Sequence, residues 1–229
     1  MKRFYKKVTA EEGDGGVRIL LDGRMIKTPA KAALLLPTKA LADAIAAEWE
    51  AQEAEIVPAT MPLMQTAATA IDRVVPQREK VIDDIAVYGG TDLVCYRATH
   101  PQSLVARQSE AWDPMLEWLA ERHGVRLTVG EGVMHIPQPP EALTRLRDVV
   151  AAQTDLALAP LYNITALAGS LVIALAVLER RLTADQAFEI SELDETHVME
   201  TWGADHEAMV RRKNNKESLA ASVRFLELI

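Results

Sequence analysis

The side chains most able to bind a metal ion are the five histidines and the carboxylates near them. Asp194 and His197 form a carboxylate-x-x-histidine pair, a spacing that places both groups on one face of a helix. A dinuclear site in a helical bundle needs two such pairs and further carboxylates, and only this pair is present. We therefore predict no metal site and interpret Asp194 and His197 as surface residues. No zinc-site spacing joins the other histidines, which are His100, His123, His135 and His206.

The motifs that bind phosphates or carry a nucleophilic serine are incomplete. Gly15-Gly16 and Gly89-Gly90 belong neither to a G-x-G-x-x-G pattern nor to a G-x-x-x-x-G-K-[ST] loop. Ser170, in A-G-S-L-V, lacks the second glycine of a nucleophile turn, and we expect it to pack inside a helix. These patterns predict no nucleotide cofactor and no catalytic serine.

Cys95 is the single cysteine, so no disulfide can form within the chain. This composition favours a reducing compartment. The neighbours of Cys95 in D-L-V-C-Y-R are largely apolar, and burial among them would raise the pKa of the thiol and leave it inert.

The charge balance argues against nucleic acid as a partner. Lys and Arg total 25 and Asp and Glu total 33, which gives a formal net charge of −8 and repels a phosphate backbone. The basic run from Arg211 to Lys216 precedes an amphipathic tail and is interpreted as a solvated helix junction. Contact with an acidic partner is the alternative.

The N-terminal part of the chain predicts a small β-meander. Val17, Ile19 and Leu21 alternate with their neighbours, and Asp22-Gly23 suits the positive φ angles of a hairpin turn. A returning strand is expected over residues 24–28, and a further short apolar run covers residues 33–36.

One helix should cover this meander. Thr38 can cap it, and Leu41, Ile45 and Trp49 then share one face at helical spacing. We predict that Trp49 is structural and packs between the helix and the sheet. The alternative is a partly exposed tryptophan that anchors a partner. Residues 1–57 are thus predicted to be a small β-rich domain.

Residues 58–229 are predicted to be a helical domain, because turn signals become rare and 3.6-residue periodicity dominates. The expected fold class is α+β, with the small β-meander domain and its one helix followed by a larger all-α domain. A short extended piece is expected over residues 125–129. The predicted helices cover residues 63–74, 76–88, 102–123, 140–154, 161–181 and 184–202.

The segment Leu156–Leu178 has 23 residues without a formal charge, which is long enough to span a bilayer. It contains Asn163, Gly169 and Ser170, which weaken it as a membrane span. We interpret it as a buried central helix of the bundle and predict no membrane insertion.

The predicted helix over residues 184–202 carries one unexpected charge. Thr183 and Gln186 fit a capping box that sets its start. Glu195 then lies in an otherwise apolar stripe, which suits a polar anchor at a protein interface if the stripe is partly open. An internal ion pair with Arg73, Arg97 or Arg180 is the alternative. The apolar members of the stripe are Ala184, Phe188, Val198, Met199 and Trp202.

Six phrases of the chain, in order, resemble an assembly chaperone family that binds the free alpha subunit of the F1 sector of ATP synthase. The match covers residues 3–212. The first three phrases are R-F-Y-K-K-V, L-D-G-R-M-I-K-T-P and E-W-E-A-Q. The others are D-L-V-C-Y-R, W-D-P-M-L-E-W and L-D-E-T-H-V-M-E-T-W-G.

The resemblance implies a two-domain chaperone with no cofactor and no enzymatic cycle. Such a protein holds the unassembled alpha subunit of F1-ATPase and shields the surface that the beta subunit later covers. The L-D-E phrase supports Glu195 as a partner-binding residue, with Phe188, Met199 and Trp202 beside it.

The family occurs in mitochondria and in related bacteria. The N-terminal segment is basic at first, but its acidic residues Glu11, Glu12 and Asp14 argue against a transit peptide. We therefore expect the bacterial cytoplasm, or the mitochondrial matrix if the chain is a processed form.

A second class of function stays open from the residues alone. A small-molecule enzyme could assemble its site from dispersed polar residues such as Asp72, Arg73 and Asp92, which no linear motif would reveal. A compact polar pocket would favour the enzyme, and an exposed apolar patch on the helical domain would favour the binding protein.

Overall fold

The computed structural model describes residues 1–229, which form two compact units. Unit 1 contains Met1–Arg78, Thr154–Pro160 and Arg224–Ile229, and unit 2 contains Glu79–Gln153 and Leu161–Val223. The helices α6 and α10, described below, contribute residues to both units, and α3 begins at the last residue of the first segment of unit 1. The division into folding domains at residues 57 and 58 stays a prediction.

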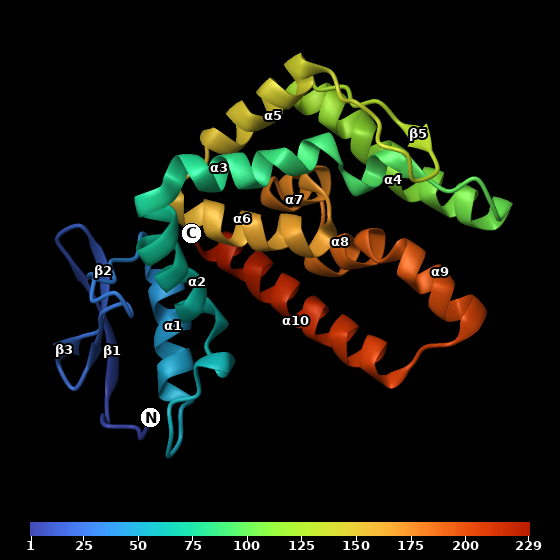
Figure 1. The fold of residues 1–229 in the computed structure, drawn as a ribbon. Helices are drawn as coiled ribbons and strands as arrows, with labels where there is room; N and C mark the ends of the chain where they lie inside the picture. Colours follow the sequence, from blue (N-terminus) through green and yellow to red (C-terminus); the bar gives the residue numbers. More distant parts are fainter. The chain divides into compact units, whose positions relative to one another are not determined.

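Unit 1 is built on a three-stranded antiparallel sheet in the order β1-β2-β3 (Figure 1). Its strands are β1 (Val8–Gly13), β2 (Gly16–Leu21) and β3 (Arg24–Met25). The inward side chains of β2 are buried as the alternation predicts, and Asp22 and Gly23 have φ angles of 49° and 79° in the predicted turn. Alternation does not find β1, because Glu11 and Glu12 occupy consecutive positions on a strand with a polar end.

Helix α1 (Lys39–Glu50) packs against β1 and β2. The Thr38 hydroxyl caps it by accepting a hydrogen bond from the Leu41 N–H at 3.1 Å. Leu41 and Ile45 are fully buried in the core of unit 1, as the helical spacing predicts.

Glu48 joins α1 to the next helix of unit 1, α2 (Pro62–Thr69). Its carboxylate accepts hydrogen bonds from the Leu63 and Met64 N–H groups, each at 2.8 Å. Free N–H groups at a helix start need acceptors, and no capping side chain next to α2 supplies one. A short 3-10 turn (Pro58–Thr60) precedes α2, a π-helical turn (Ala70–Val74) continues it, and a further 3-10 turn (Val75–Gln77) follows.

Unit 2 is largely helical, with one short parallel pair of strands, β4 (Tyr96–Arg97) and β5 (Gly130–Glu131). Strand β5 thus begins just after the extended piece predicted over residues 125–129. Two 3-10 turns, Val87–Gly90 and Leu93–Cys95, link α3 to β4. The helices are α3 (Arg78–Ala86), α4 (Gln102–His123), α5 (Pro140–Ala151), α6 (Asp155–Ala168), α7 (Leu171–Leu178), α8 (Ala184–Ser191), α9 (Leu193–Trp202) and α10 (His206–Leu228). The predicted α+β class is confirmed, with the antiparallel strands first and helices predominating after them.

The apolar segment after residue 156 is two helices, so the prediction of one helix over residues 161–181 is wrong. Helix α6 ends at Ala168, Gly169 takes a positive φ of 61°, and Ser170 caps α7 through the Ile173 N–H at 3.0 Å. Ser170 therefore starts a helix and does not pack inside one. Every residue from Leu171 to Val177 is buried, and α4 and α8 both pack against α7.

No helix of the chain combines the length and the apolar character that crossing a membrane requires.

The helix predicted over residues 184–202 is also two helices. The predicted capping box of Thr183 and Gln186 is present and starts α8. The chain then leaves helical geometry at Glu192, with φ −99° and ψ 18°, before α9 begins. The amphipathic tail is the long helix α10, which the predicted set of helices does not include.

Candidate partner-binding surface

Helices α9 and α10 expose a group of large apolar side chains, which we call the α9–α10 patch. Its members are Val198, Trp202, Met209 and Val210, with exposed fractions of 49%, 84%, 48% and 43%. Val198 and Trp202 are one helical turn apart on α9, and only Gly203 to Asp205 separate α9 from α10. Large exposed apolar side chains that gather in one region commonly mark a protein interaction site.

Arg212 holds the helices beneath this patch together. Its guanidinium lies 3.3 Å from the Glu192 carboxylate, donates to the Thr196 hydroxyl at 2.6 Å and contacts the Met199 sulfur at 3.7 Å. It also lies 5.2 Å from the centroid of the Phe188 ring. Partial burial raises the pKa of Glu192, and the charge of Arg212 opposes that rise. One side chain of α10 therefore fixes α8 and α9.

Glu195 is at the surface, with 44% of its side chain exposed. Its ion-pair partner is Arg211, at 3.6 Å, and exposed pairs of this kind contribute little to stability. Arg97, one of the internal partners considered from the sequence, pairs with Asp113 at 2.8 Å. Glu195 can therefore exchange its partner at low cost.

The other predicted binding residues lie at different depths. Trp202 is the most exposed, Met199 is half-buried, and Phe188 is only 6% exposed. Arg212 and Lys216 cover the Phe188 ring, the latter at 5.7 Å from its centroid. The predicted single stripe is thus divided by the break at Glu192, with Phe188 on α8 and the others on α9. The partner-binding roles of these residues stay predictions.

The basic run of α10 is engaged with carboxylates of this chain. Lys213 pairs with Glu217 at 3.8 Å, and Lys216 pairs with Asp185 of α8 at 2.8 Å. The sequence reasoning missed the specific role of Arg212, because its partners lie on other helices and leave no linear signal.

Helix α4 supports α9 from another side. Gln108 donates to the Asp194 carboxylate at 2.7 Å, and Arg107 pairs with Glu200 at 2.6 Å. The indole N–H of Trp112 donates to the Ile190 carbonyl at 3.0 Å. Asp194, the carboxylate of the pair with His197, is therefore occupied in helix packing.

Trp49 lies in unit 1, where its ring is partly buried against the core. It makes an edge-to-face contact with Tyr5, with ring centroids 5.7 Å apart, and the Tyr5 hydroxyl donates to the Trp49 carbonyl at 2.6 Å. The indole Nε1 is buried without a hydrogen-bond partner. The structural role of Trp49 and the alternative of a partner anchor both stay predictions.

The polar residues considered for an enzyme site serve the packing of separate units. In unit 1, the Asp72 carboxylate accepts hydrogen bonds from the Thr28 hydroxyl at 2.6 Å and the Ala30 N–H at 2.9 Å. In unit 2, Asp92 is fully buried and accepts from the Ser170 hydroxyl at 2.5 Å. Burial raises the pKa of Asp92 to about 6, against the hydrogen bonds that lower it.

Cys95 is fully buried, as its apolar neighbours suggest. Burial raises the pKa of its thiol to about 12, so the thiolate is not accessible at neutral pH. The predicted burial of Cys95 is confirmed, and the inertness of its thiol stays a prediction.

Comparison with known proteins gives one family. The model of a family described as "ATP12 chaperone protein" matches residues 2–120. Protein atp12, mitochondrial, of Schizosaccharomyces pombe is 24% identical over 234 residues, covering 96% of this chain and 80% of the relative.

Solved structures agree with that match. The crystal structure of Atp12 from Paracoccus denitrificans is 40% identical, with a TM-score of 0.96 over 99% of this chain and 97% of that one. The structure of Atu1473, a putative chaperone from Agrobacterium tumefaciens, is 42% identical, with a TM-score of 0.94 over 99% and 85% of the two chains.

Proposed function

Because this chain belongs to the ATP12 chaperone protein family, we propose that it binds the unassembled alpha subunit of F1-ATPase. In this role it shields the subunit surface that the beta subunit covers in the finished ring, without a cofactor and without a catalytic cycle. The observation that carries the proposal is the exposed α9–α10 patch, above all Trp202 at 84% exposure. We further propose that it acts in the bacterial cytoplasm, or in the mitochondrial matrix if the chain is a processed form.

The chemistry of the patch suits a protein partner. Tryptophan is enriched at the energetic centres of interfaces because its large ring removes much apolar area from water. Glu195 is a polar group on α9, two helical turns before Trp202, and its weak pair with Arg211 can be replaced by a pair with the partner. Met199 adds an adaptable contact, and the buried Phe188 supports the surface from below.

Binding of the purified alpha subunit by surface variants tests the proposal. We expect Trp202→Ala to weaken binding by at least about tenfold, since interface tryptophans often contribute 2 kcal/mol or more. Glu195→Lys should also weaken binding, because it places a like charge beside Arg211. Circular dichroism and thermal melting should stay as in the wild type, because both side chains are at the surface.

Two matched variants serve as controls. Met134→Ala removes another exposed apolar side chain, and Glu110→Lys reverses an exposed charge on α4. Both should bind the alpha subunit like the wild type. If folded Trp202→Ala and Glu195→Lys bind the subunit as tightly as the controls do, the α9–α10 patch is not the contact surface.

A further inference from the structure

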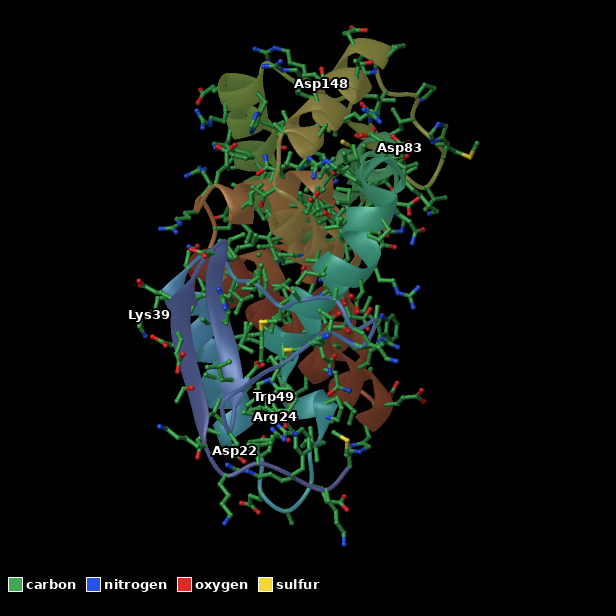
Figure 2. The ribbon with its side chains drawn as sticks, turned by 90° about the vertical axis from the view of Figure 1, so that its left-hand side faces the viewer. Asp22, Arg24, Lys39, Trp49, Asp83 and Asp148 are labelled. Carbon is green, nitrogen blue, oxygen red and sulfur yellow. The ribbon has the colours of Figure 1, made fainter.

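Unit 1 contains a pocket of about 640 Å³ that lies outside the α9–α10 patch. The N-terminal segment forms one side of it, the turn between β2 and β3 another, and Trp49 of α1 a third. We call it the Trp49 groove and define it by Phe4, Tyr5, Asp22, Arg24, Lys27 and Trp49. Figure 2 shows Asp22, Arg24 and Trp49 together at one end of unit 1. Its volume is in the range of binding sites for small molecules and peptide side chains.

One side of the groove is aromatic. Tyr5 packs edge-to-face against both neighbours, with its ring centroid 5.4 Å from that of Phe4 and 5.7 Å from that of Trp49. Tyr5 is buried, whereas Phe4 is 65% exposed. An exposed phenylalanine at the mouth of a pocket leaves apolar area that an incoming apolar side chain can cover.

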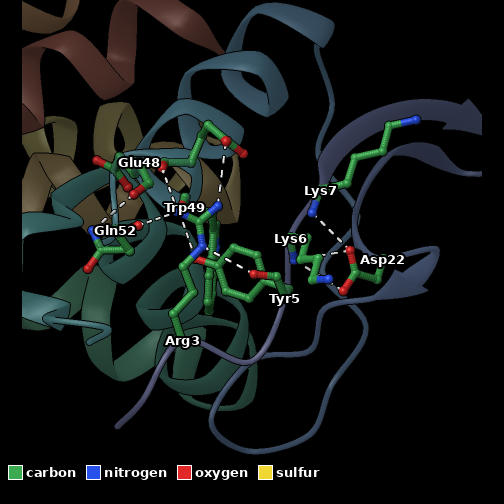
Figure 3. A network of polar contacts seen from close by, with 9 residues as sticks. Arg3, Tyr5, Lys6, Lys7, Asp22, Glu48, Trp49 and Gln52 are labelled. Carbon is green, nitrogen blue, oxygen red and sulfur yellow. Dashed lines mark hydrogen bonds and ion pairs between the residues drawn. The ribbon is translucent and has the colours of Figure 1, made fainter. Parts of the chain in front are cut away.

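Trp49, which lines the groove, has a buried hydrogen-bond donor without an acceptor. The Trp49 indole Nε1 is buried and unpartnered, although buried polar groups nearly always find a partner. The Tyr5 hydroxyl is already used, because it donates to the Trp49 carbonyl (Figure 3). Because the Nε1 atom is buried, a ligand in the groove contacts the ring of Trp49 and not its N–H.

The charges around the groove are mainly positive, although the whole chain has a net charge of −8. Arg24 and Lys27 line it, and the charge of Arg24 attracts the Asp22 carboxylate. The carboxylate among the lining residues, Asp22, accepts hydrogen bonds from the backbone N–H groups of Lys6 and Lys7 at 2.8 to 3.1 Å (Figure 3). These bonds lower the pKa of Asp22, and they direct its negative charge toward the backbone of the N-terminal segment.

We propose that the Trp49 groove binds an extended acidic segment of a partner protein. An apolar side chain of the segment packs against Phe4 and the ring of Trp49. Carboxylates on either side of the apolar residue lie near Arg24 and Lys27. This site goes beyond the proposed function, because it belongs to unit 1 and uses no residue of the α9–α10 patch.

Titration with two short peptides tests the proposal on the full chain. The probe is acetyl-DELFED-amide, and acetyl-KKLFKK-amide has the same apolar centre with the charges reversed. We expect the acidic peptide to bind and to move the indole N–H resonance of Trp49 in nitrogen-15 NMR spectra. Trp49→Phe identifies that resonance by its loss. The basic peptide should leave the resonance unchanged at equal concentration.

Charge reversal in the groove gives the second measurement. The double variant Arg24→Glu, Lys27→Glu should weaken binding of the acidic peptide by at least about tenfold, since two attractive contacts become repulsive. Lys39→Glu is the control, because Lys39 is an exposed cation of unit 1 that lies away from Arg24 and Trp49 (Figure 2). The control should change the dissociation constant less than about twofold.

The proposal is overturned if the acidic peptide does not bind, if the basic peptide binds equally well, or if the double variant binds the acidic peptide as tightly as the wild type does. Self-association of the chain through the groove, measured by sedimentation, would overturn it too. A single-stranded oligonucleotide gives a further test. If it displaces the bound peptide more strongly than excess unlabelled peptide does, the groove binds nucleic acid and the proposal is overturned. Failure here leaves the α9–α10 proposal intact, because that proposal is measured separately with Trp202→Ala.

Discussion

Asp92 is a fully buried carboxylate that organises the start of α7. It accepts hydrogen bonds from the Ser170 hydroxyl, from the Val172 N–H at 3.0 Å and from the Val94 N–H at 3.3 Å. Free N–H groups at a helix start favour a negative charge, which opposes the penalty of burial. Burial has the larger effect, and the pKa of Asp92 is raised to about 6.

The raised pKa predicts a pH dependence of stability. Because the folded state binds the proton more tightly than the unfolded state, the free energy of unfolding rises as the pH falls through about 6. Between pH 7 and pH 5 the gain from Asp92 is about 1 kcal/mol. Urea unfolding at the two pH values measures it in the wild type and in Asp92→Asn.

Asp92→Asn should lose this gain. It should also be less stable at pH 7 by about 1–3 kcal/mol, because an amide cannot accept from all three donors. The control is Glu53→Gln, at an exposed residue without an ion pair. An equal pH response in Asp92→Asn and the wild type would show that another group titrates.

Trp49 gives a second prediction at this scale. Trp49→Ala removes the ring that packs on Tyr5 and on the core, and should lower the stability by about 3 kcal/mol. Trp49→Phe keeps most of the packing and removes the unpartnered N–H, so it should cost much less. Thermal melts of both variants distinguish the roles, and an unchanged melting temperature in Trp49→Ala would remove the structural one.

Local sequence signals predicted the starts of α1 and α8 but missed two breaks, one between α6 and α7 and one between α8 and α9. The caps at Thr38 and Thr183 are residues whose own side chains accept from the following turn, so the sequence alone identifies them. The break before α7 depends on Asp92, which is far away in the sequence. The apolar run around it has helical character on both sides, so periodicity does not place the break.

For the candidate sites, too, the sequence predicted what depends on spacing within one helix and missed what depends on contacts between separate elements. Glu195, Met199 and Trp202 share one face of α9, as helical spacing predicts, although the stripe does not continue through Glu192 to Phe188. The role of Arg212 and the Trp49 groove were not predicted. Both depend on side chains that approach from separate elements, and only the folded chain brings them together.

Glu48 offers a prediction about two elements at once. Its carboxylate, on α1, accepts from the first N–H groups of α2, so it replaces the cap that α2 lacks. Glu48→Gln leaves one of these N–H groups facing an amide donor and should lower the stability by about 1–2 kcal/mol. Chemical unfolding measures the loss, with Glu53→Gln as the exposed control; equal stabilities would mean that solvent satisfies α2 equally well.

For the molecule as a whole, the two proposed contact surfaces belong to different compact units and have different chemistry. The α9–α10 patch is apolar, whereas the Trp49 groove is aromatic on one side and is lined by the cations Arg24 and Lys27. The surfaces share no residue, so we expect Trp202→Ala to leave the binding of the acidic peptide to the Trp49 groove unchanged.

We propose that this chain holds the alpha subunit of F1-ATPase before the ring closes. The most direct measurement mixes the wild-type chain with purified alpha or beta subunit and follows complex formation by sedimentation velocity. We predict a stable complex with alpha, none with beta, and release of the chain when beta is added to the complex with alpha. Equal binding of both subunits, or no binding of alpha, would contradict the account.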